Sequence, residues 1–556
     1  MSLSDSFARA PQNQAPPLQD YNTVTCDRAL TGGLAAYASD EQHGSLVQFL
    51  AQLGQVAGSA EAREHGMLAN ANAPVLRTAD RFGERIDEVA FHPSWHWMLE
   101  RGVGFGLTGS AWFSSDSDAH LRRAAGFIAW SPIEPGHACP LTMTYAAVPA
   151  LAGDADATAQ WGALLASTVY DPGVRASTAK AGVLAGMGMT EKQGGSDVRT
   201  NTTSATRAAS GTYTLRGHKW FTSAPMNDLF LVLAQAPEGL TCFTVPRVRP
   251  DGSRNAIRVV RLKDKLGNRS NASAELEFED AYAERLGDEG RGVPTIIEMV
   301  AATRLDCVLG SAGLMRRAVA EASWHASHRA AFGGILIDKP AMTGVLADLA
   351  LESEAATSLG LRLAHSVDRR DNEHERAFRR IALPLAKFWV CKRTAPVCVE
   401  AMECFGGNGY VEESGMPLLV RESPLNSIWE GSGNVNALDV LRAAQRSPHA
   451  VSAWEAEVAI AGQAAPDVLA AADDVLLRLR SALSDPSGAE AQARAIAARM
   501  AVVLQGALLV RHAPSAVSDA FVASRIVGRD PGVFGALPTS VGPSAIAEIA
   551  HRALPS

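Results

Sequence analysis

The hydrophobic periodicity of the chain changes twice along its length, and these changes constrain the fold more than any other feature. Residues 186–285 contain short runs of β-branched and aromatic residues, and Ala274–Glu279 alternates strictly between apolar and acidic side chains. Such runs are typical of β-strands, and the alternating run is typical of a half-solvated strand. On both sides of this region, Ala and Leu recur at helical spacing. The sequence therefore predicts an α+β multidomain protein with a β-rich middle domain.

Helical spacing, glycines and prolines divide the rest of the chain. Four long helical patterns in sequence indicate a four-helix bundle; they cover residues 293–331, 340–370, 375–405 and 426–446. The tail shows further helical patterns at 453–483, 488–512 and 516–526. The expected parts are an N-terminal arm (1–40), an N-terminal helical domain (41–185), a middle β-barrel or sandwich domain (186–287), a C-terminal four-helix bundle (288–446) and an additional C-terminal helical domain (447–556).

The composition excludes several classes of protein. With 51 Lys and Arg against 59 Asp and Glu, the surface as a whole does not suit a polyanion, although a local basic patch stays open. Seven cysteines include no CxxC pair, so we expect reduced thiols in a cytoplasmic protein. We expect no secretory signal and no membrane span. The pairs His92/His96 and His325/His328 lack a third ligand, so we expect no metal site.

The segment Met187–Val198 is rich in glycine. Glycines let backbone amides approach a ligand closely, and the hydroxyls of Thr190 and Ser196 can donate to ring carbonyls or phosphate oxygens. Glu191 stands where a dinucleotide-binding fingerprint needs its third glycine, and no Walker lysine follows. The segment is either a ligand-binding loop or an ordinary surface loop between domains.

The segment Gly217–Ser223 ends a predicted strand. Trp220 can stack on an aromatic ring ligand, and the hydroxyl of Thr222 or Ser223 can hydrogen-bond a ring nitrogen. The alternative is that Trp220 belongs to the core of the β-domain, which is the commoner position of a tryptophan in a strand.

The segment Ile428–Asn434 carries a lone carboxylate near the start of a bundle helix. Glu430 lies among apolar residues and glycines, where burial would raise its pKa above the free value of about 4.3 and make it a stronger base. The alternative is that Glu430 only places a negative charge in the first turn of a helix.

Taken together, these segments resemble the motifs of acyl-CoA dehydrogenases. Five motifs occur in the order and spacing of that family, at Thr190–Asp197, Lys219–Thr222, Arg329–Gly333, Phe405–Tyr410 and Glu430–Gly433. The resemblance covers roughly residues 40–445. The longer runs 187–198, 262–272 and 426–434, and the extra tail after residue 447, are similar to the AidB-like, alkylation-response branch of this family.

The resemblance implies an FAD-dependent homo-oligomer, namely a homotetramer. In each subunit FAD would lie between the β-domain and the four-helix bundle. The implied FAD contacts within one subunit are Met187, Thr190, Ser196, Trp220, Phe221, Thr222, Ser223, Ile428, Asn434 and Asn436. A neighbouring subunit would contribute Arg329, Gly406 and Gly407. Glu403 departs from the family pattern, because many members carry Gln there and a carboxylate beside a pyrophosphate is unfavourable.

The resemblance also implies a reaction on an acyl-CoA thioester. Glu430 aligns with the catalytic base, which would remove an α-proton while hydride passes from the β-carbon to flavin N5. The backbone amide of Glu430 and a ribityl hydroxyl would polarise the thioester carbonyl. Some members place the base beside a Thr-Arg pair instead, and that position is Thr303 in this chain. Arg304 aligns with a residue near the acyl-CoA entrance, although it also suits a helix-surface ion pair.

Two other functions remain open. The branch resemblance implies binding of double-stranded DNA and its protection from alkylation, with weak or vestigial dehydrogenase activity. The tail has eight Arg and no Lys against ten acidic residues, which does not support phosphate binding by the tail as a whole. Basic runs on the bundle helices and Arg442 remain candidate DNA contacts. In the third alternative, the protein is a structural oligomer in which FAD only stabilises the fold.

Overall fold

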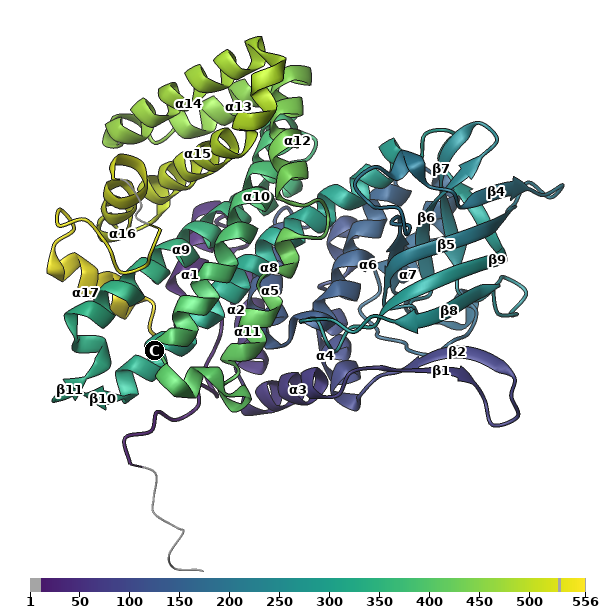
Figure 1. The fold of residues 1–556 in the computed structure, drawn as a ribbon, viewed down its shortest axis with the longest axis horizontal. Helices are drawn as coiled ribbons and strands as arrows, with labels where there is room; N and C mark the ends of the chain where they lie inside the picture. The colour runs from purple at the N-terminus through teal and green to yellow at the C-terminus, as the bar shows by residue number, and fades with distance from the viewer. Residues whose placement is uncertain (1–11, 529–531, 556) are drawn as a thin grey trace, which may run out of the picture.

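The structure is a computed structural model that describes residues 12–528 and 532–555. A β-domain at one end lies against a stack of helices that makes up most of the molecule, and the tail helices cover the opposite side of that stack (Figure 1). The predicted α+β architecture, with helical N- and C-terminal regions around a β-barrel, is confirmed.

The N-terminal region contains seven helices and one hairpin among its described residues. The hairpin was not predicted, because its first strand is short and largely exposed and its second strand buries Asp87 as well as Val89, so neither strand shows an apolar alternation. The elements are α1 (Arg28–Tyr37), α2 (His43–Ala57), α3 (Ala60–Ala71), β1 (Val75–Ala79), β2 (Arg85–Ala90), α4 (Pro93–Gly104), α5 (Ala119–Trp130), α6 (Ala138–Leu151) and α7 (Ala155–Leu165).

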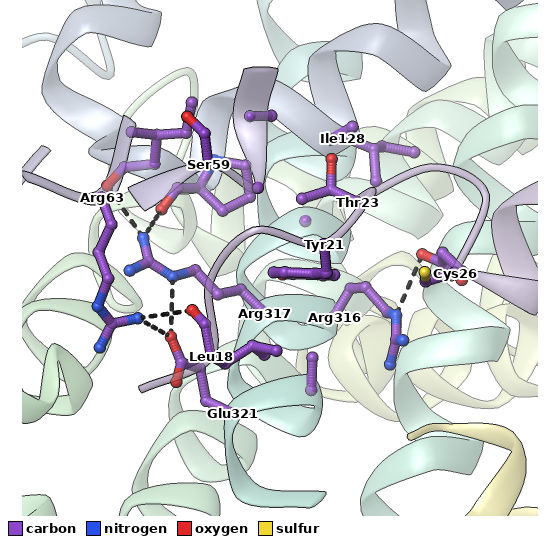
Figure 2. Close-up of a pocket in the computed structure, with 18 residues that line it drawn as sticks. Leu18, Tyr21, Thr23, Cys26, Ser59, Arg63, Ile128, Arg316, Arg317 and Glu321 are labelled. Carbon is purple, nitrogen blue, oxygen red and sulfur yellow. Dashed lines mark hydrogen bonds and ion pairs between the residues drawn. The ribbon is translucent and has the colours of Figure 1, made fainter. Parts of the chain in front are cut away.

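The N-terminal arm was expected to reach residue 40, but helix α1 lies within it. Asp27 caps α1, since its side chain accepts hydrogen bonds from two backbone amides of the first turn. The same carboxylate pairs with Arg316 at 3.2 Å, and Arg63 pairs with Glu321 at 2.6 Å beside the arm. Figure 2 shows these contacts around a small cavity of about 60 Å³. The arm is therefore tied to the bundle by the Asp27–Arg316 ion pair.

The middle domain is a seven-stranded sheet in the order β3-β6-β4-β5-β9-β7, with β8 added on β9. Strands β6 and β7 also pair, so the sheet closes on itself. Glu275 in the run Ala274–Glu279 is buried, unlike in the predicted half-solvated strand, because β8 brings Arg261 and Lys263 against it. The strands are β3 (Ala185–Gly188), β4 (Ser204–Arg207), β5 (Tyr213–Ser223), β6 (Leu229–Ala236), β7 (Gly239–Pro246), β8 (Ile257–Leu262) and β9 (Ser273–Leu286).

Three of the four predicted bundle helices match the structure to within a few residues. The fourth, expected over 426–446, begins only at Gly433, because a short 3₁₀ turn and a loop occupy residues 425–432. The short helix α11 was not predicted. The helices are α8 (Gly292–His328), α9 (Pro340–Asp368), α10 (Glu373–Glu403), α11 (Met416–Glu422) and α12 (Gly433–Arg446).

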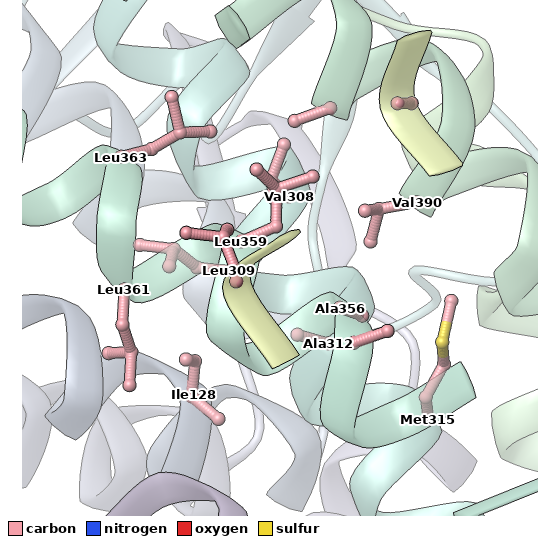
Figure 3. Close-up of a cluster of buried hydrophobic side chains, with 14 of the residues drawn as sticks. Ile128, Val308, Leu309, Ala312, Met315, Ala356, Leu359, Leu361, Leu363 and Val390 are labelled. Atoms are coloured by element: carbon pink, nitrogen blue, oxygen red, sulfur yellow. The ribbon is translucent and has the colours of Figure 1, made fainter. Parts of the chain in front are cut away.

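The core of the bundle lies between α8 and α9. Figure 3 shows Val308 and Leu309 of α8 against Leu359 of α9, with Ile128 of α5 and Val390 of α10 at the sides. Burial of such side chains supplies the main driving force that holds long helices together. Helix α8 thus becomes the central element, with neighbours on every side.

The tail forms a helical layer on the bundle. One helix predicted over 453–483 is two helices, because Gly462 and Pro466 interrupt it, and α17 was not predicted. The helical segment Gly488–His512 is long and apolar enough by composition to cross a membrane. However, 72% of its apolar 18-residue stretch is buried inside the structure, as in a core helix. The helices are α13 (Pro448–Ala459), α14 (Pro466–Ser484), α15 (Pro486–His512), α16 (Ser515–Phe521) and α17 (Pro543–Arg552), with a π-helical turn at Val522–Val527.

Candidate active site

The loop before α12 carries Glu430 in an unusual backbone conformation. Its φ is 56°, a left-handed value that few residues other than glycine adopt. The buried ammonium of Lys387, on α10, donates to three loop carbonyls, those of Asn426 at 2.6 Å, Trp429 at 2.7 Å and Gly431 at 2.9 Å. These carbonyls have no partner in regular secondary structure, so Lys387 supplies the hydrogen bonds that the loop needs. The loop is therefore held in one conformation around Glu430.

The carboxyl group of Glu430 has one hydrogen-bond partner among the described residues. Thr303 Oγ1, on α8, donates to Glu430 Oε2 at 2.7 Å. Burial raises the pKa of Glu430, against the hydrogen bond from Thr303 and the charges of Lys387 and Arg304. A buried carboxylate with a raised pKa is a stronger base than a free one. Arg304 donates to the backbone oxygen of Glu430 at 3.0 Å and pairs with Asp439 at 2.9 Å, so it braces the same loop.

A β-bulge places the second half of the site. The register between β5 and β9 shifts between Lys219 and Thr222, so Trp220 and Phe221 leave the regular ladder. The backbone amide of Trp220 donates to Thr190 O at 2.8 Å, which joins the two predicted segments. Thr222 Oγ1 is buried and has no hydrogen-bond partner among the described residues. A buried hydroxyl without a partner is costly, so this atom is suited to a ligand.

A fully buried ion pair that the sequence analysis missed fixes these two segments to each other. Lys219 Nζ lies 2.7 Å from Glu191 Oε1, and neither side chain is exposed. Glu191 also accepts from the backbone amides of Thr202 and Thr203, and Lys219 donates to Leu233 O at 2.8 Å. The sequence did contain a signal for the burial of Lys219. Alternate residues of a strand share one face, and Lys219 lies on the same face of β5 as the buried Tyr213 and Leu215.

Apolar packing and Cys139 bring the two halves of the site together. Met187 of β3 and Trp429 of the loop pack against the same buried cluster between the β-domain, α6 and α8. Burial raises the pKa of the Cys139 thiol to about 11, with a hydrogen bond from Ser223 opposing it and the charge of Glu430 adding to it. The β-domain residues and Glu430 therefore border one region.

Several predicted site residues lie at the edges of this region. Ser196, Phe221, Ile428 and Asn434 are exposed, whereas Asn436 is buried and donates to Gly431 O at 2.6 Å. Asn434 accepts from Arg494 of the tail at 2.8 Å. A tail residue thus contacts the first turn of α12, directly after the loop of Glu430, which the sequence did not indicate.

The residues expected from a neighbouring subunit are far from Glu430 within one chain. Arg329 follows the end of α8, about 39 Å along the helix from Thr303 at 1.5 Å per residue. Gly406 and Gly407 are exposed after the end of α10. Both segments meet the N-terminal arm, since Ala330 N donates to Asn13 Oδ1 and Asn408 donates to Gln14. Glu403 is exposed beside them, and Arg442 is exposed on α12.

The paired histidines have other partners. His96 shares a hydrogen bond of 2.8 Å with Tyr170, and His325 stacks on Phe405 with ring centroids 4.3 Å apart. Across residues 12–528 and 532–555 there is no group of three or more His, Cys, Asp or Glu side chains that could hold a metal ion.

Comparisons with known proteins relate this chain to acyl-CoA dehydrogenases. The adaptive response protein AidB N-terminal domain matches residues 13–172, the acyl-CoA dehydrogenase middle domain matches 186–281, and the acyl-CoA dehydrogenase C-terminal domain matches 290–445. The chain is 49% identical to the Escherichia coli (strain K12) protein named "Putative acyl-CoA dehydrogenase AidB", over 77% of this chain and 79% of that protein. It is 31% identical to Caenorhabditis elegans acyl-CoA dehydrogenase family member 11, over 84% of this chain and 80% of the relative. A crystal structure of Caenorhabditis elegans ACDH-11 in complex with C11-CoA superposes with a TM-score of 0.85 at 27% identity, covering 99% of this chain and 93% of that one.

Proposed function

Because this chain belongs to the acyl-CoA dehydrogenase family, in its AidB-like branch, we propose that it is an FAD-dependent oxidoreductase that acts on the CH–CH bond next to an acyl-CoA thioester. The observation that carries the proposal is the carboxyl of Glu430, which accepts a hydrogen bond from Thr303. It lies in a loop that Lys387 holds and that packs, through Trp429, against the same buried cluster as Met187 of the β-domain.

The residues of the β-domain fit FAD. Thr222 offers an unpartnered buried hydroxyl, Trp220 offers a ring face, and Gly195 leaves space that a Cβ would close, at 2.4 Å from Thr190 Oγ1. When bound, FAD supplies the acceptor for a hydride. The residues that would hold it are Met187, Thr190, Ser196, Trp220, Phe221, Thr222, Ser223, Ile428, Asn434 and Asn436.

Glu430 provides the base. Its carboxylate accepts the α-proton of the thioester at an Oε atom, and its raised pKa favours that transfer. The backbone N–H of Glu430 has no recorded acceptor in the described chain, so it is free to donate to the thioester carbonyl and to stabilise the charge that develops there. Thr303 holds the ionised carboxylate, and Lys387 keeps the loop from relaxing.

The exposed surface beside Arg329 supports assembly with further copies of the chain. Phe332 is 93% exposed and Tyr410 is 84% exposed, and two consecutive arm residues connect their segments. Such side chains are typical of protein interfaces. In a homotetramer, the FAD of one subunit would be reached by three residues of a neighbouring subunit, Arg329, Gly406 and Gly407.

The alternative, binding of double-stranded DNA, stays a prediction. Arg442 is exposed on α12, but Arg478, Arg511, Arg525 and Arg552 of the tail form ion pairs with carboxylates. Titration of a labelled duplex at two salt concentrations, with wild type and Arg442→Gln, tests it. Salt-sensitive binding that Arg442→Gln weakens would support the alternative, and no binding at low salt would exclude it.

Anaerobic mixing of the FAD-loaded protein with a panel of acyl-CoA thioesters tests the dehydrogenase. We expect flavin bleaching in wild type and in the control Glu403→Gln, and none in Glu430→Gln, which keeps its FAD. Bleaching that persists in Glu430→Gln would remove Glu430 from the role of base. A protein that takes up no FAD would refute the whole proposal.

A further inference from the structure

A cavity of about 560 Å³ lies on the side of α8 that faces away from Glu430. Glu298, Ala301, Ala302 and Leu305 of α8 line it, and Ala301 and Leu305 are each about 200° around the helix axis from Thr303 at about 100° per residue. The other walls come mainly from α6, α7, the end of α9 and the start of α10. Although Ala302 is next to Thr303 in the chain, neither Thr303 nor Glu430 lines the cavity, so it is distinct from the region that Glu430 borders.

The inner walls of the cavity are apolar. Val148 and Leu151 of α6, Leu305 of α8, and Leu363 and Val367 of α9 are all buried and face it. Cavities of about 300–1000 Å³ with mostly apolar walls are typical small-molecule sites. The walls offer little that would hydrogen-bond a polar ligand, so the inner part suits an alkyl chain.

Three arginines also line the cavity, of which Arg376 is exposed and Arg370 and Arg379 are half-buried. Arg376 donates only to two backbone carbonyls, and Arg379 donates to Ser366 O at 2.6 Å. Arg370 lies 3.5 Å from His120 Nε2 and 5.6 Å from the Trp112 ring centroid. Within residues 12–528 and 532–555, none of the three forms an ion pair within 4 Å, unlike Arg362 next to them, which pairs with two carboxylates.

The charge balance of the lining favours an anion. Glu298 and Asp371 also line the cavity, so the three arginines and two carboxylates of the lining carry a net charge of +1. A guanidinium without a carboxylate partner binds the carboxylate of a ligand with charge-assisted hydrogen bonds.

We propose that this cavity binds a free medium-chain fatty acid, with its alkyl chain between α6, α8 and α9 and its carboxylate at Arg370, Arg376 and Arg379. The inference goes beyond the dehydrogenase reaction and does not depend on it, since no group at Glu430 or in the β-domain takes part. The ligand differs from an acyl-CoA thioester in having a free carboxylate as its head.

Calorimetric titration of the FAD-loaded full-length protein with octanoate, decanoate and dodecanoate tests the site. We expect one site per chain and an affinity that tightens about fourfold for each added methylene, because each is transferred into the apolar walls. Dodecanol, which lacks the charge, should bind more weakly than dodecanoate. Binding that is absent, or that is independent of chain length, would overturn the proposal.

Variants separate this cavity from the region of Glu430. Val148→Trp fills the apolar part and should weaken dodecanoate at least tenfold. Arg376→Gln should weaken dodecanoate severalfold and leave dodecanol unchanged, whereas the matched control Arg369→Gln, on the same helix connection but outside the lining, should change neither. Arg376 is exposed and bonds only to local carbonyls, so its replacement does not threaten folding. Dodecanoate binding that persists in both variants and shifts the flavin absorbance would place the fatty acid beside the flavin and refute this site.

Discussion

Thr303 Oγ1 lies 2.7 Å from Glu430 Oε2, although the two residues are 127 positions apart in the chain. The hydrogen bond joins α8, the central helix of the bundle, to the loop before α12. It favours the ionised carboxylate, while burial favours the protonated one. The balance of these two effects sets the pH at which Glu430 can accept a proton.

Replacing Thr303 by Val should therefore move the activity to higher pH. The hydrogen bond from Thr303 stabilises the ionised form, so its loss raises the pKa of Glu430 further. A base works only when ionised, so the acidic limb of the pH–rate profile for flavin reduction should shift to higher pH. At high pH the rates of variant and wild type should converge. Thr303→Ser is the control that keeps the hydroxyl, and a limb that does not move in Thr303→Val would contradict the assignment.

Lys387→Met should damage both the loop and the stability. The variant leaves the carbonyls of Asn426, Trp429 and Gly431 without the donor that they share. Gly431 O keeps the hydrogen bond from Asn436, so two carbonyls are left unsatisfied. An unsatisfied buried group costs about 1–3 kcal/mol, so we expect at least about 2 kcal/mol less stability in urea unfolding, together with loss of flavin reduction. Lys392→Met, an exposed lysine one turn further along α10, is the matched control and should unfold like wild type. Equal stability of the two variants would show that Lys387 does not support the loop.

Thr222→Val should have opposite effects on the apoprotein and on flavin chemistry. The hydroxyl is buried without a partner, so its removal from the apoprotein should leave the stability unchanged or raise it by about 1 kcal/mol. With FAD bound, the same change removes a hydrogen bond to the cofactor, which should shift the flavin absorbance and slow its reduction. Thr222→Ser should restore both properties. A stability loss in the apoprotein, with flavin properties unchanged, would mean that Thr222 has only a structural role.

Two buried carboxyls outside the active site should make stability depend on pH. Burial raises the pKa of Glu134 to about 7, against a hydrogen bond from Ser270, and burial together with the charge of Glu134 raises the pKa of Glu422 to about 8. Unfolded, both would lose their protons near pH 4.5. Between that pH and about 8 the folded state holds more protons, so stability should fall as pH rises, by up to about 1.4 kcal/mol per pH unit and group.

Thermal unfolding of wild type and Glu134→Gln/Glu422→Gln over this pH range checks the prediction. The difference between the two proteins isolates these carboxyls from all other titrating groups. The stability of the variant relative to wild type should increase from pH 4.5 to about pH 8 and then level off. A difference that is constant with pH would show that neither carboxyl titrates in this range.

Local patterns predicted the helices and strands that depend on their own side chains. The continuous apolar run Leu229–Ala234 became a fully buried strand, and the long Ala- and Leu-rich segments became α8, α9 and α10. The hairpin β1–β2 was missed because β1 is exposed and β2 buries the charged Asp87 beside Val89, which hides any apolar alternation. The start of α12 was misplaced because the residues around Glu430 are held by α10 rather than by their own propensity.

The sequence by itself determined the order of helical and β-rich domains and, through five spaced motifs, the family and the identity of the candidate base. These properties depend on hydrophobic periodicity and on local residue types, which are read along the chain. Only the tertiary structure showed that Lys387 holds the loop and that Glu191 and Lys219 form a buried pair. It also showed an apolar cavity behind α8 whose three arginines have no ion-pair partner in the described part of the chain. Each of these depends on which groups lose contact with water together, and that is decided by packing between segments far apart in the chain.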